Sequence, residues 1–405
     1  MKGRLVFLSC VPMTTIFARK VAPEWFEQKG FDVEVWDVSS LYFSDASVRG
    51  YFSGSAKLQY QAGNRIEFST KAQLALAIEK LSSNAVVIHL SRHSSPCVND
   101  YWILRLFKVF SIRYAILQFE NAMPVPGGGA LTGWHYLYQR ISSLDRLFAA
   151  LPKLGKVMYF KVAELILRHT GYFARPSMAI GVGRAGRKAF DRHLKLGTAF
   201  VSIPSPAVNW EMHEVSESIC LFVDESIGYA PDAKLSGYST TTDLDKYYSN
   251  MKNVFERVEN ATGKKVVVGA SGKVEYENNP YNREIVYGKT LDLTSKACIV
   301  IGHSSSALYQ SVCFNKPILL LHDHTFTKEK KSHVDTFGSG VGISSFDTVA
   351  ISDETINHIL DQGVDRNLIY DLFREQEVEE GYLEIIHKAL MQILDISNRS
   401  KIANI

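Results

Sequence analysis

The sequence predicts an α/β protein made of two Rossmann-like domains, each a parallel sheet covered by helices. The chain has 405 residues and is 46% hydrophobic, enough for two cores and too apolar for a mostly disordered protein. Short apolar runs alternate with longer helical patterns, as expected where helices cover parallel strands. Pro204-Ser205-Pro206 breaks helix and strand alike. We therefore expect one domain over residues 1–205, another over 206–382, and a cleft between them.

Eleven short apolar runs predict strands. The first lies at the N-terminus and is too short for the apolar region of a signal peptide, so we interpret it as a strand. The predicted strands are Arg4–Ser9, Asp32–Asp37, Ala85–Leu90, Tyr114–Phe119, Ser177–Val182, Thr198–Ile203, Ile219–Val223, Lys265–Val268, Glu284–Tyr287, Ala297–Ile301 and Pro317–Leu321.

Helical periodicity predicts the connecting elements. A last helix at about Leu383–Leu394, within residues 383–405, is expected to cross back to the first domain. Charged residues interrupt the most apolar segments, so no run reaches the 18 or so residues of a membrane-spanning helix. The other predicted helices are Thr15–Lys29, Lys71–Ser82, Asp100–Phe110, Leu131–Arg146, Leu154–His169, Leu244–Thr262 and Ala307–Phe314.

The net charge of +3 is a cancellation between the two halves. Residues 1–205 carry 26 basic and 13 acidic side chains, whereas residues 206–405 carry 19 and 29. Residues 101–200 alone have 15 basic and 4 acidic side chains among many aromatics. This segment is typical either of a surface for anionic lipid headgroups or a phosphorylated acceptor, with peripheral membrane contact, or of a solvated basic face. No recognition motif for nucleic acid accompanies the charge, so we expect no nucleic-acid partner.

The cysteines and histidines give little sign of a metal or a disulfide scaffold. Five cysteines, at positions 10, 97, 220, 298 and 313, are spread along the chain without a paired motif, which favours thiols and a cytoplasmic location. His322-Asp323-His324 lacks a third partner at metal-ligand spacing. We expect neither a metal nor a cofactor.

The segment 297–309 predicts an anion site. An apolar strand ends at Gly302, and His303, Ser304, Ser305 and Ser306 follow before a helix begins. The first turn of a helix has unpaired N–H groups, and hydroxyls beside them favour phosphate or carboxylate. Since one serine would suffice as a helix cap, three in a row favour a binding site.

Two other glycine-containing segments are weaker candidates. Residues 181–186 read GxGxxG, with Arg184 inside, but the next strand lacks the acidic residue of a dinucleotide site. We interpret them as a tight strand–helix turn facing the cleft. Gly127, Gly128 and Gly129 form either a loop that closes over substrate or an ordinary long loop.

Acid–base candidates follow two predicted strands. Asp224 and Glu225 follow Ile219–Val223, and crowding between their carboxylates favours a raised pKa and a general base. A helix cap or a surface pair is the alternative. Arg92 and His93 follow Ala85–Leu90; His93 is either a base, an acceptor contact or a structural residue.

Together these motifs resemble a known family. Residues 219–325 are similar to the nucleotide-sugar-binding half of GT-B glycosyltransferases, and most similar to bacterial surface-carbohydrate biosynthesis proteins related to bacterial sialyltransferases. The resemblance rests on three segments. The first is the acidic pair, followed by Ser226 where many sialyltransferases have glycine. The others are a Gly-Lys-Thr segment at 288–290 and the run Gly302 to Leu308, which is followed by Asn315-Lys316-Pro317. The family's His-Pro motif is absent. The resemblance implies that Ser271 or Lys273, in that region, takes the place of its histidine at the donor phosphate, as a hydrogen-bond donor or a cation.

The resemblance implies a metal-independent sugar transfer. Ser304, Ser305 and the helix start would hold the phosphate of a nucleotide-sugar donor, CMP-linked sugars among them, while Lys289 and Thr290 line the nucleotide side. Asp224 or Glu225 would deprotonate a hydroxyl of a glycan or lipid-linked acceptor held by the first domain, where Arg92, Gly127, Gly128 and Arg184 lie. The product would be a capsule or lipopolysaccharide at the inner face of the membrane.

Two alternatives stay open. A non-hydrolysing nucleotide-sugar 2-epimerase shares the two-domain architecture and a comparable serine-bearing loop. A non-catalytic subunit that binds sugar nucleotides or glycans would explain the missing His-Pro motif.

Overall fold

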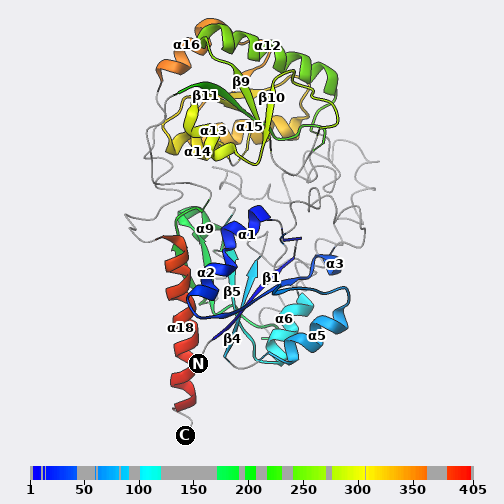
Figure 1. The fold of residues 1–405 in the computed structure, drawn as a ribbon, viewed down its shortest axis with the longest axis vertical. Coiled ribbons are helices and arrows are strands. Elements are labelled where there is room, and N and C mark those ends of the chain that lie inside the picture. The colour runs from blue at the N-terminus through cyan, green and yellow to red at the C-terminus, as the bar shows by residue number, and fades with distance from the viewer. Residues whose placement is uncertain are drawn as a thin grey trace, which may run out of the picture.

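The computed structural model describes residues 3–10, 12–13, 15–42, 60, 63–81, 84–90, 101–119, 171–190, 197–206, 217–229, 240–270, 276–305, 307–362 and 381–402. Within them the chain forms two parallel sheets, one in each half of the sequence, lying in separate lobes along the long axis of the molecule (Figure 1).

The first sheet has seven strands in the order β3-β2-β1-β4-β5-β6-β7, and all neighbours run parallel. Its centre is β1, which pairs with β2 on one side and β4 on the other. The strands are β1 (Arg4–Ser9), β2 (Asp32–Asp37), β3 (Arg65–Glu67), β4 (Ala85–Leu90), β5 (Arg113–Gln118), β6 (Met178–Val182) and β7 (Ala199–Ile203).

The second sheet has six parallel strands in the order β10-β9-β8-β11-β12-β13. Both sheets therefore reverse their winding beside the first strand, as in a Rossmann fold. The α/β class with two Rossmann-like parallel sheets is confirmed. The strands are β8 (Ile219–Val223), β9 (Val266–Ala270), β10 (Glu284–Tyr287), β11 (Ala297–Gly302), β12 (Ile318–His322) and β13 (Phe346–Asp347).

All eleven predicted strands are present, with ends shifted by at most two residues. Apolar runs indicated these strands because a strand covered on both faces is continuously hydrophobic. β4 is an example, since all six of its residues are buried. The short edge strands β3 and β13 were not predicted; both are only partly buried or exposed, and neither has an apolar run.

The helices of the first half are short. The predicted helix Thr15–Lys29 is wrong in one respect: it is two helices, because Ala22 adopts a left-handed conformation with φ 49° directly before Pro23. A capping box formed by Thr70 and Gln73 starts α5. The helices are α1 (Thr15–Val21), α2 (Pro23–Gln28), α3 (Ser39–Tyr42), α5 (Lys71–Glu79), α6 (Tyr101–Val109) and α9 (Gly183–Ala189). The predicted helices Leu131–Arg146 and Leu154–His169 lie outside the described residues.

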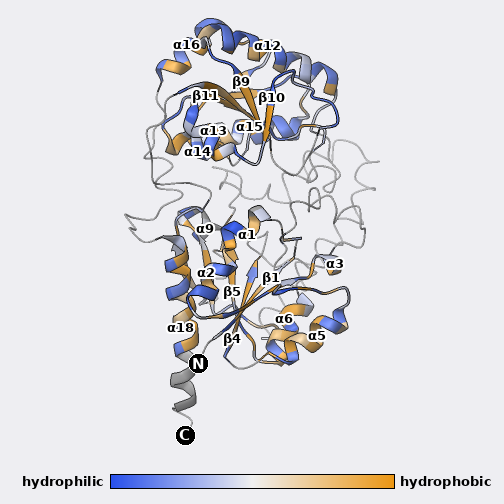
Figure 2. Ribbon diagram, in the orientation of Figure 1, coloured by the Kyte–Doolittle hydropathy of each residue, from blue (hydrophilic) through white to orange (hydrophobic). Residues whose placement is uncertain are grey.

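Within the described residues, two helices of 19 and 14 residues and three shorter ones cover the second sheet. Asp243 caps the start of α12, and Gly263, with φ 65°, ends it, so the predicted range Leu244–Thr262 is confirmed. Polar residues lie on the outer faces of these helices and apolar residues face the strands (Figure 2). The helices are α12 (Leu244–Thr262), α13 (Thr290–Lys296), α14 (Leu308–Cys313), α15 (Lys328–Val341) and α16 (Asp353–Asp361).

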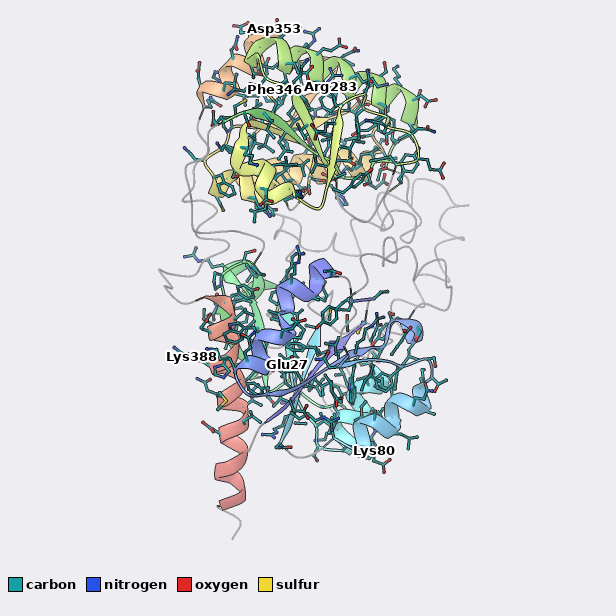
Figure 3. All side chains as sticks on the ribbon, in the orientation of Figure 1. Glu27, Lys80, Arg283, Phe346, Asp353 and Lys388 are labelled. Atoms are coloured by element: carbon teal, nitrogen blue, oxygen red, sulfur yellow. The ribbon has the colours of Figure 1, made fainter. Side chains whose placement is uncertain are left out.

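The C-terminal helix α18 (Tyr382–Ile402) lies against the first sheet, not the second (Figure 1). Its buried residues include Ile386, Leu390 and Ile393. Arg113 Nη1 of β5 donates to the Ile393 carbonyl at 3.0 Å. Figure 3 accordingly shows Lys388 of α18 in the same lobe as Glu27 of α2. Among the described helices, none is long and apolar enough to cross a membrane.

Candidate functional site

The candidate site lies where the second sheet reverses its winding. Glu225 follows β8 and Ser304 follows β11, and these two strands are direct neighbours on either side of the reversal. In open α/β sheets, ligands bind beyond the carboxyl ends of the strands at this point. The topology therefore brings together the acidic pair and the serine segment, which are far apart in the sequence.

Glu225, Ser304 and Lys330 form a hydrogen-bonded group that we call the Glu225 cluster. The backbone N–H of Ser304 and the ammonium of Lys330 both donate to the Glu225 carboxylate. Ser304 Oγ lies 3.3 Å from Glu225 Oε2 and 2.8 Å from Lys330 Nζ. Lys330 comes from the first turn of α15 and is only 4% exposed. A carboxylate thus occupies the donors that could hold another anion.

The Glu225 carboxylate is ionised. Burial alone would raise its pKa, but the ammonium of Lys330 and the two donated hydrogen bonds outweigh burial and lower the pKa. The pair is therefore a buried ion pair, in which each charge depends on the other for its solvation.

Asp224 lies in a separate group of hydroxyl donors and is 3% exposed. Tyr276 donates to its Oδ2 at 2.6 Å, and Tyr281 donates to its Oδ1 at 2.7 Å. Burial raises the pKa of Asp224, and the two phenol hydrogen bonds offset that rise in part. Burial also raises the pKa of Tyr281, so its phenol stays a proton donor. In this conformation Asp224 is held by donors rather than open to an acceptor.

Ser226 lies in the tight turn that follows the acidic pair. Its backbone has φ 54°, in the left-handed region that favours glycine, and its N–H donates to Asp224 Oδ1 at 2.8 Å. The turn folds the backbone back toward the Asp224 carboxylate. Within the described residues, the buried Ser226 hydroxyl has no hydrogen-bond partner.

His303 anchors the start of the serine segment through two hydrogen bonds inside the second lobe. The side chain is fully buried, its Nδ1 lies 2.8 Å from the Leu321 carbonyl and its Nε2 lies 3.0 Å from the Tyr247 hydroxyl. Burial lowers its pKa to about 4, so the ring is neutral. Because a carbonyl can only accept, Nδ1 carries the proton and Nε2 accepts from Tyr247. Both ring nitrogens are hydrogen-bonded within the protein. The geometry therefore favours a structural role for His303 over direct contact with a bound ligand.

Ser305 and Gly302 shape the turn into α14. Ser305 Oγ accepts from the Ala307 N–H at 3.3 Å, a local contact two residues along the chain, directly before α14. A Cβ at Gly302 would lie 2.8 Å from Leu308, so the glycine permits the close packing of this turn. Within the described residues α14 has no side-chain cap at its N-cap residue Ala307, and Ser304 faces Glu225. Ser306 lies outside the described residues.

Lys289 and Thr290 stand at the start of α13, beside the carboxyl end of β10. Gly288 before them has φ 68°, and its N–H donates to the Ala270 carbonyl at 3.0 Å. Lys289 is exposed. The two residues are thus at the same edge of the sheet as the Glu225 cluster, two strands further along the order.

Asp323 after β12 holds the loop that leads to α15. It accepts from the Thr325 N–H at 2.9 Å and from Asn250 Nδ2 at 2.9 Å, and it also accepts from the Thr348 hydroxyl. Of the three residues at 322–324, the acidic one is thus a structural anchor. The described residues contain no group of three or more His, Cys, Asp or Glu that could hold a metal ion.

Of the remaining predicted site residues, Arg184 is the one within the part of the chain that the structure describes. Arg184 is exposed on α9, where Gly183 has φ 49° and a Cβ at Gly181 would lie 3.2 Å from Gly186, which makes this segment a tight strand–helix turn. The remaining candidates lie outside the described residues: His93, Arg92, Gly127, Gly128, Ser271 and Lys273.

Sequence reasoning missed Lys330, Tyr276 and Tyr281. Lys330 lies in the run Lys328 to Lys331, which is typical of a solvated surface, and only the fold shows that one of these lysines is buried. The signal that could have indicated the tyrosines is their density, since Tyr276 and Tyr281 lie between the parallel strands β9 and β10 and Tyr287 ends β10.

Comparisons with known proteins agree with this description only in outline. No protein-family profile matches the sequence, and no curated protein matches it. The UDP-GlcNAc 2-epimerase from Methanocaldococcus jannaschii is 10% identical, with a TM-score of 0.49 over 97% of this chain and 100% of that one. A glycosyltransferase of kitacinnamycin is 12% identical, with a TM-score of 0.45 over 89% and 91%. The glycosyltransferase SnogD from Streptomyces nogalater is 10% identical, with a TM-score of 0.45 over 100% and 99%. These scores are below 0.5, so we infer neither site nor activity from them.

Proposed function

We propose that the protein is a GT-B-type glycosyltransferase that binds the phosphate of a nucleotide-sugar donor at the Glu225 cluster. The observation that supports this most is the buried ammonium of Lys330 beside the N–H and hydroxyl of Ser304, at the winding reversal of a Rossmann-like sheet. A buried cation with neighbouring hydrogen-bond donors suits a phosphate better than a neutral ligand.

The donor phosphate would replace the Glu225 carboxylate. Both are anions, and both need the Ser304 N–H and the Lys330 ammonium, so they compete for the same donors. When the sugar leaves, charge grows on the phosphate, and Lys330 and Ser304 stabilise that charge most in a desolvated site. Metal independence is part of the proposal.

The catalytic base is proposed to be one of the two carboxylates. Asp224 has the raised pKa that a base near neutral pH needs, but Tyr276 and Tyr281 cover it. Glu225 is released from Lys330 when phosphate takes its place, and it would then be free to accept a proton from an acceptor hydroxyl. We therefore favour Glu225. His93 stays a proposed second base or acceptor contact.

The acceptor proposal rests on charge. The first half of the chain has an excess of 13 basic residues, which suits an anionic glycan or lipid-linked acceptor, and capsule or lipopolysaccharide synthesis at the cytoplasmic face of a membrane follows from the family resemblance. The donor sugar and its nucleotide, CMP-linked or other, belong to the same proposal.

A non-catalytic nucleotide-binding subunit is the second candidate. The observation in its favour is that both carboxylates are already held by donors, Asp224 by two phenols and Glu225 by Lys330 and Ser304. Such a protein would bind nucleotide sugars without turnover.

A nucleotide panel with three variants tests the proposal. Binding of CMP, UDP, TDP and GDP and of their sugars is measured by calorimetry, and release of free nucleotide is measured with and without glycan acceptors. Ser304→Ala should weaken phosphate binding roughly tenfold or more, since a hydrogen bond to a charged group contributes about 1.5–3 kcal/mol. Glu225→Gln should bind nucleotide more tightly, because it removes the competing charge, while transfer falls. Ser332→Ala, an exposed serine of α15, is the control.

Each outcome distinguishes the candidates. Loss of transfer with tighter binding in Glu225→Gln supports Glu225 as both competitor and base. Binding without turnover for every sugar supports the non-catalytic subunit. Epimerisation of a nucleotide sugar without acceptor would indicate the 2-epimerase. If Ser304→Ala binds every nucleotide as the unaltered protein does, the proposed phosphate site is wrong.

A further inference from the structure

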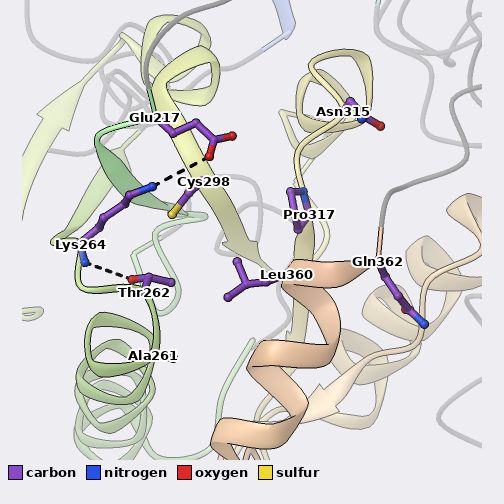
Figure 4. A pocket seen from close by; sticks show the side chains of 9 residues that line it. All are labelled: Glu217, Ala261, Thr262, Lys264, Cys298, Asn315, Pro317, Leu360 and Gln362. Atoms are coloured by element: carbon purple, nitrogen blue, oxygen red, sulfur yellow. Dashed lines mark hydrogen bonds and ion pairs between the residues drawn. The ribbon is translucent and has the colours of Figure 1, made fainter.

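A pocket lies at the end of the second sheet opposite the Glu225 cluster. It has a volume of about 560 Å³ and is lined by residues that precede or begin strands β8, β9, β11 and β12, together with Leu360 and Gln362 at the end of α16 (Figure 4). Because the Glu225 cluster is at the carboxyl ends of these strands, this pocket is separate from the candidate donor site. The residues used below are Glu217, Thr262, Lys264 and Cys298.

Two thiols meet at the wall of this pocket. Cys298 of β11 lines it, and Cys298 Sγ lies 3.6 Å from Cys220 Sγ of the neighbouring strand β8. The register of the two strands shifts between Ala297 and Ile299, at Cys298 itself. Cys220 is fully buried behind Cys298, and its sulfur lies 3.2 Å from Thr262 Oγ1.

The surroundings favour thiolate formation at Cys298. The hydrogen bond from the Cys220 thiol lowers the pKa of Cys298; burial opposes this, and the Lys264 ammonium supports it. The Glu217 carboxylate, which lies 3.9 Å from Lys264 Nζ, raises the pKa of Cys298. Figure 4 shows Lys264 between Glu217 and Thr262, with the Cys298 sulfur nearby.

We propose that Cys220 and Cys298 are an oxidisable thiol pair, in which a hydroperoxide entering the pocket reacts at Cys298 and Cys220 then closes an intrachain disulfide. The Cys298 thiolate attacks the peroxide oxygen, the O–O bond breaks, and the sulfenic acid forms with loss of water or an alcohol. Cys220 sulfur attacks the sulfenic sulfur, the S–O bond breaks, and the hydroxyl leaves as water with the Cys220 proton. The two thiols supply the two electrons that reduce the peroxide.

The geometry requires a small movement. A disulfide bond is about 2.05 Å long, so the sulfurs must approach by about 1.5 Å from their present separation of 3.6 Å. The irregular pairing at Cys298 provides local freedom that a regular ladder would not. The proposal concerns residues outside the donor site and does not depend on the proposed function.

Peptide mapping of the full chain tests the proposal without any variant. The protein is treated with hydrogen peroxide, blocked with an alkylating agent and digested with trypsin followed by chymotrypsin; the second cleavage, after Tyr309, separates Cys298 from Cys313. We expect a cross-linked peptide pair containing Cys220 and Cys298, with the loss of two hydrogens, that disappears after reduction.

Two variants sharpen the test. Cys298→Ser should abolish the cross-link and leave Cys220 reduced, whereas Cys220→Ser should leave Cys298 to proceed to sulfinic acid or a mixed disulfide. Cys10→Ser is the control and should form the cross-link normally. The proposal is overturned if peroxide oxidises Cys10 while Cys220 and Cys298 remain thiols, or if Cys298 pairs with another cysteine.

Discussion

Lys330 and Glu225 are 105 residues apart in the chain and form a buried ion pair at the carboxyl ends of the second sheet. Their side chains are 5% and 17% exposed, so water solvates neither charge well. The stability of this corner of the protein therefore depends on the pair being complete, whatever ligand the site binds.

Replacing the ammonium tests this dependence. Lys330→Met leaves the Glu225 carboxylate buried without its cation, and breaking such a pair costs about 3–5 kcal/mol. We expect a loss of that size in the free energy of unfolding, measured by urea denaturation at neutral pH. Lys331→Met, the exposed neighbour in α15, should change it by less than about 0.5 kcal/mol.

A double variant separates charge from packing. Lys330→Met combined with Glu225→Gln removes both charges and should recover much of the lost stability, since no unpaired charge remains. If the double variant is as unstable as the sum of the single ones, the loss comes from packing and the ion pair is not the cause.

The phenol of Tyr281 is expected to stabilise the charged form of Asp224. Tyr281→Phe removes a 2.7 Å hydrogen bond to a buried carboxylate and should cost about 1.5–3 kcal/mol. Tyr248→Phe is the matched control, because its hydroxyl donates to the neutral Ile227 carbonyl and should cost only about 1 kcal/mol. Urea unfolding of both variants measures the difference.

The pH dependence of this loss has a defined sign. Burial raises the folded-state pKa of Asp224 above its unfolded value, and removing a donor to the carboxylate raises it further. The cost of Tyr281→Phe should therefore grow as pH rises through the pKa of Asp224 and shrink in acid, where Asp224 is protonated in both proteins. A cost that is constant with pH would show that the hydrogen bond does not favour the charged form.

The sheets could be predicted from sequence, and so could the meeting of the two segments that carry the proposed donor site, because both depend on local signals. Buried parallel strands are apolar throughout, and the segments that follow β8 and β11 carry the acidic pair and the serines. Parallel strands align their carboxyl ends, so residues such as Glu225 and Ser304 meet even though they are distant in the chain.

The role of Lys330 could not be predicted, because burial of one lysine in a basic run depends on tertiary packing. α15 itself was missed since its sequence contains Gly338 and Gly340, which disfavour a helix. The structure shows the reason for one of them: a Cβ at Gly338 would lie 2.4 Å from the Ile343 carbonyl oxygen. Local propensity is overridden there by close packing of the helix on the following chain.

Ser226 offers a stabilising substitution. Its left-handed backbone costs a non-glycine residue roughly 1–2 kcal/mol, and its buried hydroxyl is unpaired within the described residues. The greater freedom of glycine in the unfolded chain cancels part of the gain, so Ser226→Gly should raise the free energy of unfolding by about 0.5–1 kcal/mol. Ser226→Val should lower it, because a β-branched residue is strained in this region. Thermal unfolding of the three proteins checks the order, and a Ser226→Gly protein that melts below the unaltered one would contradict it.

His303 should make the protein sensitive to mild acid. Its folded pKa of about 4 is below the unfolded value near 6.5, so the unfolded chain binds the proton more readily between these values. The stabilisation is fully present above about pH 6.5 and is lost as pH falls toward 4, by up to about 3 kcal/mol at 1.36 kcal/mol per pKa unit. The pKa of Glu225 is lowered, so its own contribution is lost only below the ordinary pKa of a glutamate, which is below the measured pH range of 7 to 4.5. His303→Gln keeps a donor for the Leu321 carbonyl and an acceptor for Tyr247 but does not titrate. His333 and His387, whose pKa values are also lowered by burial, are present in both proteins and cancel in the comparison. Urea unfolding of both proteins at several pH values from 7 to 4.5 should therefore show a steeper decline for the unaltered protein, whereas parallel curves would mean that His303 is protonated as easily in the folded as in the unfolded chain.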